Sequence, residues 1–144
     1  MPLARVLPAT LTRWPARLEH VSEKPEIIID GAHNPAGTRA LAAYIRRFYA
    51  GRRIWLVYGA LRDKAVSEMT STLFPLAGRV ILTAPANSRA MPPEDIVAPG
   101  AIVTRSIAEA IELFSDASPD DVIFIAGSLY LAGEARALLV KQKP

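Results

Sequence analysis

The residues best suited to chemistry follow the apolar run of residues 27–29, where Asp30, Gly31, His33 and Asn34 stand together. A carboxylate accepts hydrogen bonds from hydroxyl and N–H groups, and an imidazole exchanges a proton near neutral pH. Gly31 permits a backbone conformation that other residues avoid, or a close approach by a ligand. The stretch therefore predicts either a ligand-binding loop or a tight turn.

Two further apolar segments end in polar residues. Asp63 and Lys64 follow the segment 54–60, and Ser128 closes the segment 121–128. Because ligands gather at the carboxyl ends of parallel strands, these groups are expected to converge with Asp30 and His33 if the three segments are neighbouring strands.

Each candidate also has a simpler interpretation. Asp30 is able to accept backbone N–H bonds in a turn, and Asn34 to cap a helix. His33 lacks a second histidine or carboxylate at ligand spacing, so no metal site is predicted, and His20 has no feature that suggests a role. Ordinary helix-start positions are an alternative for three residues: Asp63, Lys64 and Ser128.

The elements that must position these residues alternate between strand and helix. A helix after residue 34 is clearly predicted, because Asn34 is a good N-cap, Pro35 suits the first turn and Gly51 suits the end. Strands are expected at residues 17–21, 27–29, 54–60, 79–85, 101–105 and 121–128. The other helices are expected at residues 63–74, 92–99, 107–117 and 129–142.

This alternation predicts the α/β class. The expected architecture is a three-layer Rossmann-like sandwich around a mostly parallel sheet. Residues 1–12 are expected to be a linker or tail, and residues 13–144 a single domain. A length of 144 residues and an apolar content of 51% agree with one globular core.

Composition argues against several classes of protein. No apolar run approaches the roughly 18 residues needed to span a bilayer, and no signal peptide is recognisable. Cysteine is absent, which excludes disulfides and thiolate metal sites. The net charge of +3 comes from scattered arginines without interleaved aromatic residues, so nucleic-acid binding is not predicted. A cytoplasmic location, without a membrane, fits these features.

Two nucleotide-binding motifs are absent. The eight glycines never form G-x-x-x-x-G-K-[ST], and no G-x-G-x-x-G follows an expected strand. The chain therefore lacks a phosphate-cradling P-loop and a dinucleotide fingerprint. Any nucleotide is expected to contact it from one side only.

Three stretches together resemble the C-terminal domain of folylpolyglutamate synthase/dihydrofolate synthase, in the Mur ligase superfamily. They are WPARLEHVSEKPEIIIDGAHNPAG, YGALRDKAVSEM and IAGSLYLAGEAR, and their order and spacing agree with the family over roughly residues 13–140. Two positions depart from the family pattern. Ala16 replaces the glycine of W-P-G-R, and Ala65 replaces the second aspartate of D-K-D.

The resemblance implies an ATP- and Mg²⁺-dependent ligase that joins L-glutamate to folate or dihydropteroate through an acyl phosphate. The P-loop and most metal ligands of the family belong to an N-terminal domain, which nothing here resembles. The chain is thus expected to be a domain that closes over ATP and glutamate held by that partner domain of the same polypeptide, and to be inactive alone. Another Mur-type amide ligase and a non-catalytic α/β binding module are the alternatives.

The resemblance also implies roles for individual residues. Arg17 and Asp30 match positions that contact ATP, and His33 matches a histidine near the junction of ATP and glutamate, where a catalytic role is also implied. Ser128 matches a serine on the glutamate side. Asp63 and Lys64 are retained from the D-K-D segment as candidate substrate contacts.

Overall fold

A six-stranded sheet forms the centre of the computed structural model, which describes residues 17–62 and 65–140. The strand order is β1-β2-β6-β3-β4-β5; β1 pairs antiparallel with β2, and all other pairs are parallel. The strands are β1 (Glu19–Glu23), β2 (Glu26–Ile29), β3 (Ile54–Tyr58), β4 (Arg79–Leu82), β5 (Ile102–Val103) and β6 (Val122–Ala126). The predicted α/β class with a mostly parallel sheet is confirmed.

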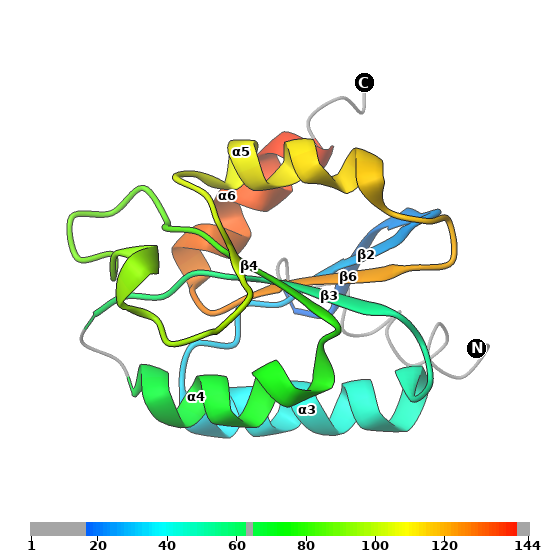
Figure 1. Cartoon of the computed structure of the whole chain (residues 1–144), viewed down its shortest axis with the longest axis horizontal. Helices are drawn as coiled ribbons and strands as arrows, with labels where there is room; N and C mark the ends of the chain where they lie inside the picture. The colour runs from blue at the N-terminus through cyan, green and yellow to red at the C-terminus, as the bar shows by residue number, and fades with distance from the viewer. Residues whose placement is uncertain (1–16, 63–64, 141–144) are drawn as a thin grey trace.

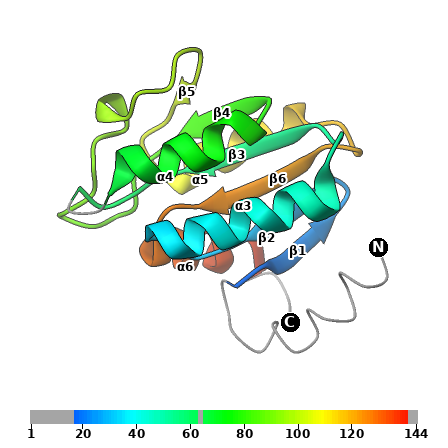
Figure 2. The same cartoon turned by 90° about the horizontal axis from the view of Figure 1, so that it is seen from below.

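Helices cover both faces of this sheet, as Figure 1 shows. One face carries α3 (Pro35–Tyr49) and α4 (Val66–Leu73), and the other carries α5 (Ile107–Glu112) and α6 (Leu129–Val140). Figure 2 shows α3 and α4 side by side, with β1 at one edge of the sheet and β5 toward the other. Short 3-10 turns complete the chain at η1 (Phe74–Leu76), η2 (Pro93–Asp95) and η3 (Leu113–Asp116). The three-layer sandwich is therefore confirmed.

The central strands β3 and β6 are buried along their whole length. Alternate residues of β6 point to opposite faces, so Phe124 packs under α3 and α4 whereas Ile123 and Ile125 pack under α5 and α6. Burial on both faces explains why these strands are continuous apolar runs.

The helix α3 has the predicted ends. The Asn34 side chain accepts a hydrogen bond from the Gly37 N–H at 2.7 Å, and Pro35 is the first helical residue. The chain leaves the helix at Ala50, and Gly51 follows with φ of +82°. Local chemistry alone was enough to specify this element.

Several predicted boundaries were wrong. The first strand begins at Glu19 rather than at residue 17, because the chain bends at Leu18, whose N–H bonds to Asp30. The helix predicted at residues 92–99 is only the single turn η2, because the backbone becomes extended at Ile96. The helix predicted at residues 107–117 tightens into η3 after Glu112.

The helix predicted from residue 63 is observed from Val66 onward, while Asp63 and Lys64 themselves lie outside the described residues. Within the described ranges, none of the helices combines the length and the apolar character required to cross a bilayer.

Candidate functional site

The carboxyl ends of β2, β6 and β3 lie side by side, as their predicted common edge requires. Backbone hydrogen bonds join the loops that follow them. The Asp30 N–H donates to the Ile125 carbonyl at 2.9 Å, and the Gly127 N–H donates to the Ala32 carbonyl at 3.0 Å. The loops after β2 and β6 therefore form one connected edge.

Gly127 is required at this edge for two reasons. Its φ of +117° lies in a region that other residues avoid, and a Cβ atom there would lie 2.4 Å from the Gly59 carbonyl oxygen. Any side chain would push the β6 loop away from the β3 loop. The glycine thus allows the close approach of two strand ends.

A cavity of about 390 Å³ lies at the end of β2 and the start of α3. Four of the predicted site residues line it: Arg17, Asp30, His33 and Asn34. Leu18, Leu41 and Leu129 contribute apolar wall, the last of them from α6. The cavity therefore combines an acid, an imidazole and a guanidinium with apolar surface.

Asp30 is only 6% exposed, and both of its carboxylate oxygens accept backbone hydrogen bonds. Oδ1 accepts from the Leu18 N–H and Oδ2 from the Ala32 N–H, each at 3.0 Å. Burial raises the pKa of Asp30, although these two bonds and the nearby Arg17 and His33 oppose the rise. The turn role foreseen as the simpler interpretation is real, and each oxygen retains a further lone pair for a ligand hydroxyl.

His33 is half-buried, and its orientation is set by its own loop. Its Nδ1 lies 2.8 Å from the Gly31 carbonyl oxygen, which only accepts, so Nδ1 carries the proton and donates. The other ring nitrogen, Nε2, is then the one left for a ligand. An imidazole held in this way is able to accept or donate a proton at a defined atom.

Arg17 is exposed at the same cavity. It makes no hydrogen bond or ion pair with the described part of the chain, although its charge acts on Asp30. A guanidinium without a competing carboxylate partner suits an anionic ligand such as a phosphate.

Ser128 does not line this cavity. It is 2% exposed, and its hydroxyl oxygen accepts from the N–H groups of Tyr130 and Leu131 at 3.0 and 3.3 Å, which caps α6. The next residue, Leu129, reaches the cavity instead. The structure thus brings Arg17, Asp30 and His33 to one cavity, and Ser128 lies outside it.

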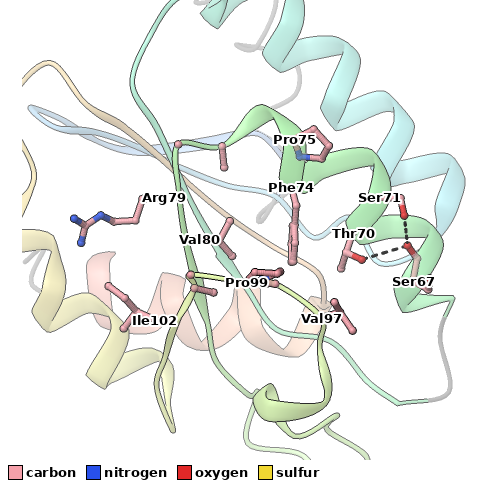
Figure 3. A pocket seen from close by; sticks show the side chains of 15 residues that line it. Ser67, Thr70, Ser71, Phe74, Pro75, Arg79, Val80, Val97, Pro99 and Ile102 are labelled. Atoms are coloured by element: carbon pink, nitrogen blue, oxygen red, sulfur yellow. Dashed lines mark hydrogen bonds between the residues drawn. The ribbon is translucent and has the colours of Figure 1, made fainter.

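A larger cavity, of about 860 Å³, lies on the β4 side of the sheet between α4 and residues 97–102 (Figure 3). The hydroxyls of Thr70 and Ser71 both bond to the Ser67 carbonyl of their own helix. Arg79 extends away from the other labelled side chains, and its guanidinium stacks on the Trp55 ring at 4.8 Å. Although this cavity is bigger, Arg79 is the one charged side chain among the described residues that line it, so the chemistry favours the smaller one.

Two residues that line the cavity were not predicted from the sequence. Leu18 and Leu129 are apolar and carry no signal for chemistry. Glu19 forms an ion pair with Arg136 on α6, 117 positions away.

Among the residues that the structure describes, no three acidic or histidine side chains gather as a metal site.

Comparisons with known proteins identify the family to which this fold belongs. Residues 16–129 match the family described as "Mur ligase, glutamate ligase domain". Folylpolyglutamate synthase from Lacticaseibacillus casei is 36% identical over 134 residues, which cover 92% of this chain but only 31% of that protein.

A second relative is a cell-wall enzyme, the UDP-N-acetylmuramoyl-L-alanyl-D-glutamate–2,6-diaminopimelate ligase of Alkalilimnicola ehrlichii. It is 35% identical over 133 residues, covering 83% of this chain and 26% of that protein. The solved structure of Mycobacterium tuberculosis folylpolyglutamate synthase complexed with ADP superposes with a TM-score of 0.76 at 29% identity, over 87% of this chain and 32% of that one. The chain thus spans between about a quarter and a third of the length of these three relatives.

Proposed function

The chain belongs to the glutamate ligase domain family of the Mur ligases, and we propose that it is the C-terminal domain of an ATP-dependent ligase that joins L-glutamate to folate or dihydropteroate. The identity with the Lacticaseibacillus casei synthase supports this choice of substrates. On this proposal residues 13–144 form the domain, residues 1–12 a linker or tail, and the remainder of the enzyme is an N-terminal P-loop domain of the same polypeptide.

One observation carries the proposal. Arg17, Asp30 and His33 come from two stretches of sequence, and the fold brings them to one cavity at the carboxyl edge of β2. These are the residues that the family resemblance connects with ATP and with the incoming amino acid. Edges of this kind are where open α/β sheets bind ligands.

The chain's own residues have distinct roles in this proposal. Arg17 contacts phosphate or ribose oxygens of ATP, and Asp30 accepts a ribose hydroxyl while holding the loop. His33 presents Nε2 where the glutamate amine meets the activated carboxylate. Ser128, at the start of α6, is a candidate contact for the glutamate carboxylate once the domains close. Asp63 and Lys64 are further candidate contacts.

The chemistry needs both domains. A substrate carboxylate oxygen attacks the γ-phosphorus of ATP and releases ADP; the glutamate amine then attacks the acyl carbon and releases phosphate. Mg²⁺ supplies charge neutralisation on the phosphates and is held mainly by the N-terminal domain. Arg17 adds positive charge to the same site on closure, and the isolated domain is therefore inactive.

The test is a chimera. This chain replaces the matching third of the Lacticaseibacillus casei synthase, and ATP-dependent incorporation of labelled glutamate into dihydropteroate and tetrahydrofolate is measured. We expect activity in the chimera, none in the isolated chain, and a loss of at least about 100-fold in kcat/KM for Arg17→Ala or Asp30→Ala. An active chimera in which both variants retain full activity contradicts the assignment of the site.

The diaminopimelate ligase relative supports a second candidate, a Mur-type ligase with another acid and another amino acid. Two chimeras distinguish the candidates. Glutamate incorporation into folates by the first chimera favours the folate ligase. In a second chimera, this chain replaces the matching part of the diaminopimelate ligase, and turnover of cell-wall precursors only in that chimera favours the Mur-type alternative.

A further inference from the structure

The bend that carries Arg17 contains Leu18, the one non-glycine residue with a positive φ among those that the structure describes. Leu18 has φ of +48°, in the left-handed region, which costs a non-glycine residue roughly 1 kcal/mol. Its side chain packs partly against the core under α3. Such a conformation persists only where neighbouring contacts hold it, and it lies directly between Arg17 and β1.

The first contact that holds the bend is the Asp30 carboxylate, which accepts the Leu18 N–H at 3.0 Å. The second comes from the other side of the sheet. Arg136 on α6 donates from Nε to both carboxylate oxygens of Glu19, each at 3.0 Å. The bend is thus fixed by one acid of the site and by one ion pair to a distant helix.

The Glu19–Arg136 pair differs from an ordinary surface ion pair. The Glu19 side chain is 15% exposed and that of Arg136 is 42% exposed, so the carboxylate is largely withdrawn from solvent. Exposed pairs contribute little because water screens them, whereas a largely buried carboxylate depends on its partner. Removing Arg136 would take away the partner that joins Glu19 to α6.

The strand β1 lies at the edge of the described sheet, where it pairs with β2, and its register shifts between His20 and Ser22. The ladder and the His20 contacts with Glu26 and Tyr49 hold the strand from Glu19 onward, whereas Leu18 lies before the first ladder pair. The helix α6, in contrast, is packed on the sheet, and its first residue Leu129 already lines the cavity.

We propose that Arg136 is a positioning residue: its ion pair with Glu19 ties the bend at Leu18 to α6 and so keeps Arg17 at the mouth of the site cavity. Arg136 itself does not line the cavity. The proposal depends on the proposed function only where nucleotide affinity is measured, because the effect on the bend is a property of this chain alone.

The first experiment measures the bend directly by NMR of this chain. Arg136→Ala is expected to increase hydrogen exchange of the Leu18 amide by about tenfold or more and to increase the fast motion of the Arg17 amide. Arg136→Lys keeps the charge and is expected to give an intermediate result. If Arg136→Ala does not fold, the lysine variant carries the test.

Arg53→Ala is the matched control. Arg53 forms an ion pair with the buried Asp121 at 3.2 Å, beside the start of β6 at the opposite end of the sheet. We expect a comparable change in melting temperature and no change in Leu18 exchange. Equal Leu18 exchange in the Arg136 and Arg53 variants would mean that Arg136 only stabilises the fold, and would overturn the proposal.

The second experiment uses ADP titration of the same chain at millimolar concentrations. Arg136→Ala is expected to weaken ADP binding by about fivefold, and to have no further effect when Arg17→Ala is already present. Independent, additive effects overturn the coupling. Absence of ADP binding in the unaltered chain contradicts the nucleotide role of the isolated domain, while the exchange of Leu18 still decides whether Arg136 positions the bend.

Discussion

An acidic residue lies at each end of the strand β2, and the surroundings shift the pKa values of the two in opposite directions. Glu26, at the amino end, accepts the Tyr49 hydroxyl at 2.6 Å, lies 3.1 Å from His20 Nε2 and is 3.9 Å from an Arg52 nitrogen. Burial alone would raise its pKa, but the bonds to His20 and Tyr49, with the charge of Arg52, lower it below 4.5.

Among the described residues, Asp30, at the carboxyl end, has no side chain as a hydrogen-bond partner. Its bonds come from two backbone N–H groups, and burial raises its pKa above 3.8. Glu26 is thus held by side chains, whereas Asp30 holds its loop through backbone groups and also lines a cavity with Arg17. The contrast teaches that the partners of a withdrawn carboxylate, and not burial alone, decide the direction of its pKa shift.

The largest expected effect is that of Asp30→Ala. It leaves the N–H groups of Leu18 and Ala32 unpaired and frees the bend before β1, so we expect a loss of about 3 kcal/mol in the free energy of unfolding. Urea denaturation measures this. A loss below about 1 kcal/mol would show that Asp30 does not hold the loop.

Glu26→Gln tests the other end of the strand. It removes the charge that orders His20, Tyr49 and Arg52, and we expect a loss of about 1.5 kcal/mol. Nucleotide affinity should stay unchanged, because Glu26 lies at the amino end of β2. A weaker affinity for ADP in this variant would show that the amino end of β2 also affects nucleotide binding, contrary to the proposed contrast with the carboxyl end.

Asn34→Ala is expected to cost about 1 kcal/mol through loss of the N-cap of α3. Ser106→Ala is its matched control, since the Ser106 hydroxyl caps α5 by accepting from the Glu109 N–H, away from the cavity. Thermal melts should show similar destabilisation in both variants, with a change in ADP affinity confined to Asn34→Ala. If Asn34→Ala and Ser106→Ala bind ADP with the same affinity, Asn34 only caps α3.

The smallest effect is the pH dependence of stability. The pKa of Glu26 is lowered in the folded state, so its contribution is present above pH 4.5 and is lost as pH falls below that value. The pKa of Asp30 is raised, so the folded state binds its proton more tightly, and stability falls as pH rises from 3.8 through the raised pKa.

Urea titrations between pH 3 and 7 therefore give two difference curves. When the free energy of unfolding of Glu26→Gln is subtracted from that of the unaltered chain, the difference should rise with pH. The same subtraction for Asp30→Asn should give a difference that falls with pH. Slopes of the same sign would contradict the assignment of opposite pKa shifts.

Much of the fold was accessible from local sequence. Asn34, Pro35 and Gly51 predicted both ends of α3, because capping and helix-ending chemistry act over a few residues. The apolar runs of β3 and β6 predicted buried strands, and Asp30 was correctly expected directly after a strand, at the carboxyl edge of the sheet. Roles carried over from the family resemblance remain proposals.

The sequence by itself determined the elements, their order and the candidate residues of the loop after β2. Only the tertiary structure decided which of them meet. The insertion of β6 between β2 and β3 sets the neighbours of that loop, turns Ser128 toward its own helix and brings Glu19 to Arg136. The Glu19–Arg136 contact joins residues 117 positions apart, and its geometry depends on packing of the whole sheet rather than on any local preference.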